Sequence, residues 1–163
     1  MYIGPLPSSL SYLYLGYLNL ASNKLTGTLD SLLPTHPYKI MQYLDLSRNN
    51  FNGSIPSGLY DMSSLQYLDL SFTQLNGDLS SDIKKWTQLS LMNISDCNFT
   101  GPLPSTVNMM TSLQLLSLRN NAFSGVLTNN LGLTFTLQYL DLSLNKFEGN
   151  IIVFISYNSA QLM

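Results

Sequence analysis

The sequence predicts a fold of the α/β class, a solenoid whose successive coils form a right-handed superhelix. The first observation is a unit of the form L-x-x-L-x-L-x-x-N-x-L/F-x-G, whose six copies start near residues 15, 41, 65, 89, 113 and 137. A repeat period in the twenties is typical of solenoids. The second observation is the L-x-L alternation inside each copy, which has the period of a β-strand with one buried face. The third is a glycine at the same place in every copy.

The fourth and sixth positions of each copy are expected to point into the core from a short strand. Strands of successive coils would then lie parallel and side by side, about 4.8 Å apart. The inward residues would be Leu18, Leu20, Leu44, Leu46, Leu68, Leu70, Met92, Ile94, Leu116, Leu118, Leu140 and Leu142.

The second half of each copy predicts the return path of the coil. An apolar column is expected to stack as an interior spine, and it consists of Leu25, Phe51, Leu75, Phe99, Phe123 and Phe147. The glycine two residues later suits a backbone position with positive φ or a close approach between coils. The convex segments that follow contain Pro and Gly, so we expect short 3-10 or irregular segments there and few or no long helices. Trp86 lies in one of these segments and is expected to be part of the core.

Position nine of the unit is Asn23, Asn49, Asn121 or Asn145 in four copies, but Thr73 and Cys97 in the other two. An asparagine amide can donate and accept, so it can pair the backbone groups of adjacent coils in a dry interior. Cys97, the single cysteine, is expected to be a buried structural thiol.

We expect one domain over residues 1–163, with a partial repeat at 1–14 and a truncated end at 152–163. The start resembles the second half of a repeat, because Gly4-Pro5-Leu6-Pro7 matches Gly101-Pro102-Leu103-Pro104. This favours a fragment of a longer protein. The single step of 26 residues indicates a two-residue surface insertion within 34–39.

Composition excludes several classes of function. A net charge of −2 and 10% charged residues, with no basic run, argue against nucleic-acid binding, which needs clustered Lys and Arg. No signal peptide and no membrane span are predicted in the given chain. His36, the single histidine, has no nucleophile in a matching context, so no catalytic triad is predicted. We predict no enzyme activity, no cofactor and no metal.

The complete unit, with Gly53-Ser54-Ile55-Pro56 or Gly101-Pro102-Leu103-Pro104 after the asparagine segment, resembles the plant-type extracellular leucine-rich repeat. That family includes ectodomains of receptor-like kinases and receptor-like proteins, and polygalacturonase-inhibiting proteins. The resemblance implies a right-handed leucine-rich-repeat superhelix with a parallel β-sheet on its concave face. It also implies an extracellular or cell-surface location, with membrane attachment only through segments outside this chain.

By this resemblance, the expected function is non-catalytic recognition of a protein or peptide ligand, with a co-receptor or a glycan as further partner classes. One alternative is a soluble inhibitor of a secreted cell-wall hydrolase, which shares the repeat and differs in its surface residues. A minor alternative is an ice-binding solenoid. That alternative needs a regular Thr or Asn array, and the residues beside the glycines are mixed.

The candidate binding residues are those that would face outward from the concave sheet and its following turn. They are Tyr17, Tyr43, Asp45, Arg48, Tyr67, Asp69, Phe72, Asp96, Arg119, Tyr139, Asp141 and Leu144. Tyrosine and arginine are common at binding hot spots. An alternative interpretation is that the recurring tyrosines and aspartates only maintain the repeat through cross-strand packing. The irregular positions, Arg48, Phe72, Asp96, Arg119 and Leu144, are therefore the better evidence for a partner.

Three N-x-S/T sequons are candidate N-glycosylation sites, at Asn52, Asn93 and Asn98. A glycan on Asn93 would obstruct the strand face, so Asn52 and Asn98 are favoured. Asp45 and Asp69 would lie on adjacent strands, a spacing compatible with glycosidase chemistry or a shared cation. An open sheet without a pocket that excludes water argues against both uses.

Overall fold

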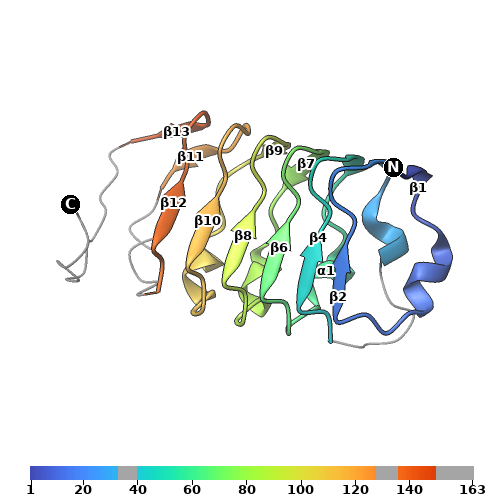
Figure 1. Ribbon diagram of the computed structural model, residues 1–163. Coiled ribbons are helices and arrows are strands. Elements are labelled where there is room, and N and C mark those ends of the chain that lie inside the picture. Colours follow the sequence, from blue (N-terminus) through green and yellow to red (C-terminus); the bar gives the residue numbers. More distant parts are fainter. Residues whose placement is uncertain (33–39, 128–135, 150–163) are drawn as a thin grey trace.

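The computed structural model describes residues 1–32, 40–127 and 136–149, which form a row of stacked coils (Figure 1). The predicted insertion with His36 and the predicted truncated end lie outside the described residues. Each coil contributes one strand to a six-stranded parallel sheet, the inner sheet, with the order β12-β10-β8-β6-β4-β2. Its strands are β2 (Tyr17–Asn19), β4 (Tyr43–Asp45), β6 (Tyr67–Asp69), β8 (Leu91–Asn93), β10 (Leu115–Ser117) and β12 (Tyr139–Asp141).

The inner sheet keeps the predicted register. Leu18 pairs with Leu44, Leu44 with Leu68, and Leu68 with Met92, and the row continues to Leu116 and Leu140. The predicted leucine columns therefore stack in one row, and the prediction of a parallel sheet in a leucine-rich-repeat solenoid is confirmed.

A second set of short parallel strands follows the turn of each coil, and the sequence analysis did not anticipate it. Five of these strands form one sheet in the order β1-β3-β5-β7-β9, and two more form the pair β11-β13. They are β1 (Ile3–Pro5), β3 (Lys24–Gly27), β5 (Asn50–Gly53), β7 (Gln74–Asp78), β9 (Asn98–Thr100), β11 (Ser124–Val126) and β13 (Lys146–Glu148). Most of these strands end at or next to a glycine, a residue type that is unfavourable in strands. Strand propensity therefore did not predict them.

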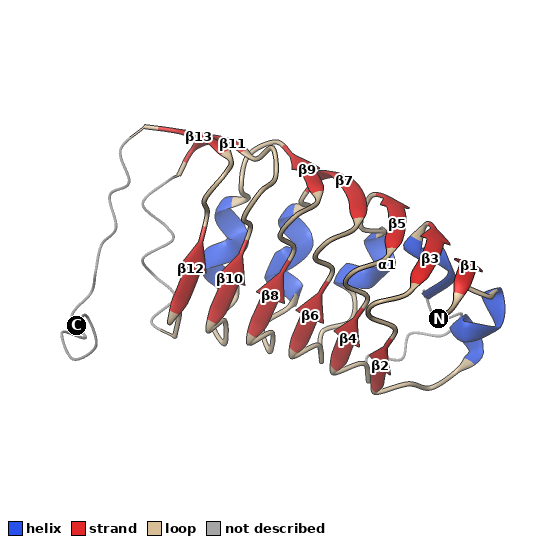
Figure 2. Ribbon diagram, turned by 45° about the horizontal axis from the view of Figure 1, so that its top comes forward, coloured by secondary structure: helices blue, strands red, loops and turns tan. Residues whose placement is uncertain are grey.

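The helices are short, as predicted, and most of them lie behind the inner sheet in the view of Figure 2. Within the described residues, four are 3-10 turns and one is a single α-helical turn: η1 (Ser8–Tyr12), η2 (Leu29–Leu32), α1 (Ser57–Tyr60), η3 (Ser81–Lys85) and η4 (Ser105–Met109). Pro56 and Pro104 precede two of them and set an extended backbone at the entry.

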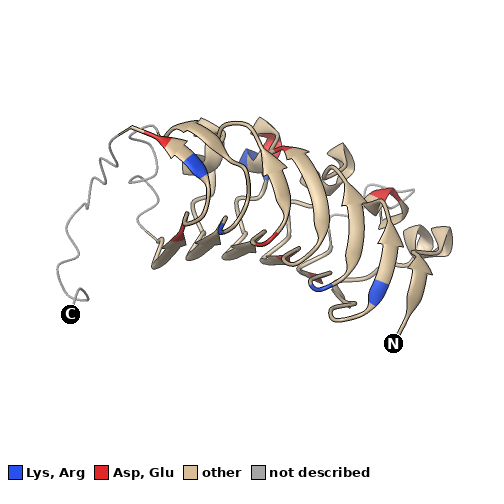
Figure 3. Ribbon diagram, turned by 90° about the horizontal axis from the view of Figure 1, so that it is seen from above, with Lys and Arg blue, Asp and Glu red and all other residues tan. Residues whose placement is uncertain are grey.

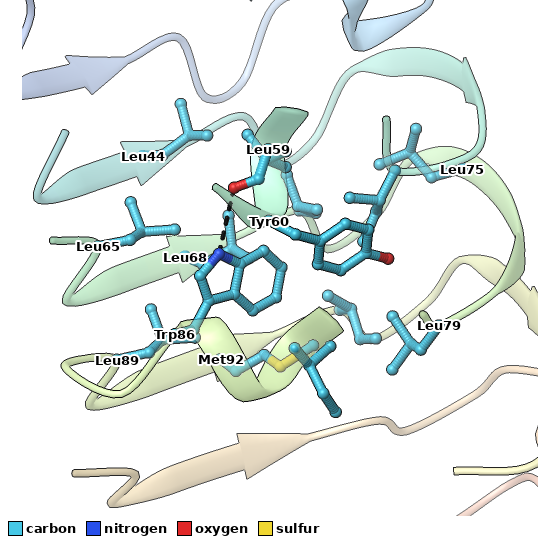
Figure 4. Close-up of a cluster of buried hydrophobic side chains, with 14 of the residues drawn as sticks. Leu44, Leu59, Tyr60, Leu65, Leu68, Leu75, Leu79, Trp86, Leu89 and Met92 are labelled. Carbon is cyan, nitrogen blue, oxygen red and sulfur yellow. Dashed lines mark hydrogen bonds between the residues drawn. The ribbon is translucent and has the colours of Figure 1, made fainter. Parts of the chain in front are cut away.

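The core lies between the inner sheet and these short helices, and Figure 4 shows its central part. Trp86 is fully buried, stacks on Tyr60 at 5.0 Å between ring centroids, and donates from Nε1 to the Leu59 carbonyl at 3.2 Å. The prediction that Trp86 belongs to the core is confirmed. At the ends of the row the inward residues are less covered than expected, because Leu18, Leu20 and Leu142 are partly buried and Leu140 is 38% exposed. Its strand β12 pairs with a neighbour on one side only in the described part of the chain.

The asparagine column ties consecutive coils together. Asn49 Nδ2 donates to the carbonyls of Leu20 at 2.9 Å and Leu46 at 3.0 Å, while its Oδ1 accepts from the Leu25 amide at 3.0 Å. Asn121 makes the same kind of bridge.

The glycine column has positive φ throughout. At Gly101, for example, φ is +70° and an added Cβ would meet Asp78 at 2.5 Å. Both columns thus play the structural parts that their residue types predict.

Candidate partner-binding surface

The outward face of the inner sheet begins with a stack of three tyrosines. Ring centroids of Tyr17 and Tyr43 lie 4.3 Å apart, and those of Tyr43 and Tyr67 lie 4.2 Å apart, with nearly parallel planes. Burial raises the pKa of the Tyr43 and Tyr67 hydroxyls above the ordinary tyrosine value. Farther along the row, Tyr139 is 51% exposed. The outward face of the sheet therefore presents a rigid stack of aromatic rings, and the tyrosine hydroxyls at the edge of this stack can donate hydrogen bonds.

The aspartates of position five shape the turn that follows each strand. Asp45 Oδ1 accepts from the Ser47 amide at 3.1 Å and the Ser47 hydroxyl at 2.7 Å, and Asp45 is only 8% exposed. Asp69 repeats this arrangement with Ser71, at 2.9 and 2.6 Å. These bonds favour the alternative that the aspartates maintain the repeat.

Neither of these two carboxylates lies in a site built for a metal ion. Asp69 Oδ2 accepts from Asn93 Nδ2 at 3.1 Å, so its second oxygen is also occupied. Among the residues that the structure describes, no group of three or more His, Cys, Asp or Glu side chains could hold a metal ion.

The next residues along the surface are the position-eight residues, which we call the turn row: Ser22, Arg48, Phe72, Asp96, Asn120 and Leu144. All six have left-handed backbone conformations, with φ between +52° and +57°. Asparagine and aspartate tolerate this conformation, whereas bulky side chains rarely adopt it. Each turn-row amide from Ser22 to Asn120 donates to a carbonyl of the next coil at 2.8 to 3.0 Å, so the row is held in place.

The turn row carries exposed side chains of different chemistry on adjacent coils. The Arg48 guanidinium lies over the Phe72 ring, 4.4 Å from its centroid, and Phe72 remains 45% exposed. Asp96 Oδ1 accepts from Asn120 Nδ2 at 2.8 Å. Leu144 is 61% exposed. The structure thus brings three of the irregular candidate residues, Arg48, Phe72 and Asp96, onto consecutive coils.

The last strands of the inner sheet place the remaining candidate residues together. Arg119 Nη1 donates to the Ser143 hydroxyl at 2.8 Å, and Asp141 accepts from the same hydroxyl at 2.6 Å. These hydrogen bonds from Ser143, together with the positive charge of Arg119, lower the pKa of Asp141. Figure 3 shows that acidic and basic residues are scattered along the coils.

Beside the turn row lies a shallow hollow of about 580 Å³, lined in part by Thr73, Asp96, Cys97 and Asn120. Cys97 is 9% exposed, and its thiol lies 3.3 Å from the Thr73 hydroxyl. Burial raises the pKa of Cys97, which keeps the thiol protonated and unreactive. The hollow therefore offers polar contacts, and the cysteine has the structural role expected from the sequence.

The three sequons occupy different surroundings. Asn52 on β5 and Asn98 on β9 are exposed and lie on the second set of strands, away from the inner sheet. Asn93 is half-buried on β8, and its amide is engaged with Asp69 and with the Ser95 backbone. The geometry therefore leaves Asn52 and Asn98 as the accessible pair.

Comparison with known sequences identifies the repeat. Sequence models described as leucine-rich repeat match residues 14–75, 88–110 and 135–156. A comparison with curated proteins gives no match. In the part of the chain that the structure describes, no helix is long or apolar enough to cross a membrane.

Comparison with solved structures gives matches among plant receptors. The plant peptide hormone receptor RGFR1 in complex with RGF2 is 25% identical with a TM-score of 0.84, over 89% of this chain and 23% of that one. The Arabidopsis receptor kinase HAESA ectodomain, in complex with an IDA peptide hormone, is 29% identical with a TM-score of 0.82, over 88% and 24%. The chain therefore spans about a quarter of these receptors.

A shorter relative is matched over most of its length. A chain of the BIR3–SERK2 complex from Arabidopsis thaliana is 32% identical with a TM-score of 0.70. The match covers 82% of this chain and 70% of that one. An identity of this size over most of a relative shows common family membership as well as a common fold.

Proposed function

Because this chain belongs to the plant-type extracellular leucine-rich-repeat family, we propose that it is a recognition module of an extracellular or cell-surface receptor, without catalytic activity. Its ligand is a peptide or protein, and a co-receptor is a second partner. Similar structures include receptors in complex with peptide hormones. We treat residues 1–163 as one such module.

The exposed row of the inner sheet carries this proposal. It joins the Tyr17–Tyr43–Tyr67 stack to the turn row, so aromatic area and polar groups lie next to each other on one rigid surface. Aromatic and arginine side chains of this kind supply most of the binding energy in protein interfaces. Among the candidate residues that the sequence predicts, the proposed contact residues are the exposed ones, with the turn row and the outer tyrosines foremost. Asp45 and Asp69 are not among them, because both are engaged in the turns that follow their strands.

Glycans are proposed at Asn52 and Asn98. Both side chains are exposed, and both lie on strands outside the inner sheet. A glycan at either place would leave the tyrosine stack uncovered. Asn93 is a poor acceptor, because its amide already donates to Asp69 at 3.1 Å.

The proposal is tested with a random peptide library displayed on phage and selected on the immobilised chain. Selected peptides are then measured on the Tyr17→Ser/Tyr139→Ser double variant, which removes the two most exposed tyrosines of the row. We expect affinity to fall about tenfold or more, as for loss of interface hot spots. The matched control is Lys84→Gln on η3, an exposed residue behind the sheet, which should leave affinity unchanged. Equal loss in both variants, or no selected peptide, contradicts the proposal.

A further inference from the structure

The turn row contains bulky residues at places where the backbone favours small or amide side chains. Asn120 and Asp96 suit a φ near +53°, but Arg48 and Phe72 have the same conformation with large, exposed side chains. Such residues are unfavourable in left-handed backbone. Strained, exposed residues that packing does not require are typical of binding sites.

Arg48 is oriented for a ligand by its contact with Phe72. The guanidinium carbon lies over the ring, 4.4 Å from the centroid. A guanidinium in contact with an aromatic face can still donate from the N–H groups at its edge. Within the described residues, the ion pairs are those of Lys85 with Asp61 and Asp82, so Arg48 has no carboxylate partner in the fold. Its positive charge is therefore free to meet an acidic ligand group.

Two coils farther along, Asp96 presents the opposite charge. Its Oδ1 accepts from Asn120 Nδ2 at 2.8 Å, and within the described residues its other oxygen accepts no side-chain hydrogen bond and forms no ion pair. It borders the 580 Å³ hollow, where a ligand side chain can lie. The exposed ring of Phe72 separates the two charges along the row.

The spacing of these groups selects a ligand conformation. Adjacent parallel strands are about 4.8 Å apart, so Arg48 and Asp96 on alternate coils are separated by about 9.6 Å along the row. A polyproline II chain advances about 9.3 Å in three residues and brings residues i and i+3 to the same side. A fully extended strand puts i and i+3 on opposite sides.

Building on the proposed function, we infer that Arg48, Phe72 and Asp96 determine ligand specificity by binding a polyproline II segment with an acidic and a basic residue three positions apart. The acidic side chain binds Arg48, the basic one binds Asp96, and a proline between them packs on Phe72. Prolines in such segments commonly dock on exposed aromatic rings. The rest of the inner sheet adds affinity beyond this three-point contact.

The probes are two blocked synthetic peptides, Gly-Ser-Glu-Pro-Pro-Lys-Ser-Gly and Gly-Ser-Lys-Pro-Pro-Glu-Ser-Gly, together with versions that lack one proline. Binding is measured by titration calorimetry on the full chain. We expect one charge order to bind about tenfold more tightly than the other and than both shortened peptides, the size of one lost charged contact. Loss of order preference or of spacing preference would overturn the inference.

The decisive variant exchanges the two charges, Arg48→Asp with Asp96→Arg, and keeps the net charge. It should prefer the opposite charge order to the parent chain. Phe72→Asn should weaken both peptides about fivefold to tenfold, consistent with a lost aromatic contact, while Lys84→Gln should bind like the parent. Thermal unfolding of each variant confirms that it is folded. If library-selected peptides bind through Tyr17 and Tyr139 but ignore the charge exchange, this inference fails while the proposed function stands.

Discussion

Two neighbouring columns of the repeat, positions eight and nine, have opposite roles. The asparagine column is buried or half-buried, and Asn49 joins the backbones of two coils. The turn row lies one residue earlier, is mostly exposed and varies from Arg48 to Leu144. Position nine is regular because its asparagine side chains make the hydrogen bonds that join adjacent coils. Position eight varies, despite its strained backbone, because its exposed side chains are available to contact a partner.

The largest expected difference between the columns is in stability. Asn49→Ala should lower the free energy of unfolding by about 3 kcal/mol, because the Leu25 amide and the Leu20 carbonyl lose their partner in a dry interior. Urea unfolding measures the change. The adjacent control, Arg48→Ala, should stay within about 0.5 kcal/mol of the parent, as for surface substitutions. Similar losses at both positions would contradict the division of roles.

Restoring asparagine at Cys97, where the asparagine column is interrupted, should stabilise the fold. Cys97→Asn should raise the free energy of unfolding by about 1 kcal/mol, because the new amide oxygen can accept from Leu75, whose amide now lies 3.5 Å from the Thr73 hydroxyl. The hollow beside Cys97 provides room for the larger side chain. Chemical unfolding of Cys97→Asn and of the control Cys97→Ala tests this, and only the asparagine should stabilise.

Strain in the turn row predicts a smaller gain. Leu144→Asn should raise the free energy of unfolding by about 0.5 kcal/mol, since asparagine tolerates a φ of +56° better than leucine and Leu144 is 61% exposed. Leu144→Val, with a β-branched side chain, should instead destabilise. Thermal unfolding of the two variants should therefore shift in opposite directions.

The smallest expected effect concerns acid stability at position five. Hydrogen bonds from Ser143 lower the pKa of Asp141 from 3.8, so the folded state favours the charged form. Its contribution is present above the unfolded pKa and is lost as pH falls through the folded pKa. The stability difference between the parent and Asp141→Asn should therefore shrink below about pH 4. Unfolding curves at pH 7 and pH 3 provide the comparison, and a constant difference would contradict it.

The period of the sequence was enough to predict the inner sheet, its register and the glycine and asparagine columns. These features depend on residue types whose physical requirements are narrow, such as the positive φ at Gly101 and the paired backbone groups around Asn49. The left-handed turn row could not be predicted. Arg48, Phe72 and Leu144 are residue types that avoid this conformation. The amides of Arg48 and Phe72 donate to carbonyls of the next coil, a contact that the sequence pattern does not reveal.

The sequence was enough to predict which residues form the candidate surface, but not how their side chains contact one another. Outward positions follow from the strand period, so Tyr17, Tyr43 and Tyr67 were placed on one face. Their stacking at 4.2 to 4.3 Å, and the placement of Arg48 over Phe72, depend on rotamers that a one-dimensional pattern does not contain. The turn bonds that occupy Asp45 were likewise visible only in three dimensions.

Register between coils has an evolutionary consequence. Because the inner strands pair position for position, excision of residues 65–88 would bring the coil of Arg48 directly against that of Asp96. A guanidinium that now rests on an aromatic ring would then face a carboxylate on the adjoining coil. Recombination in units of 24 residues can thus change the spacing between surface residues such as Arg48 and Asp96 in one step. It needs no point mutation and leaves the buried columns in register.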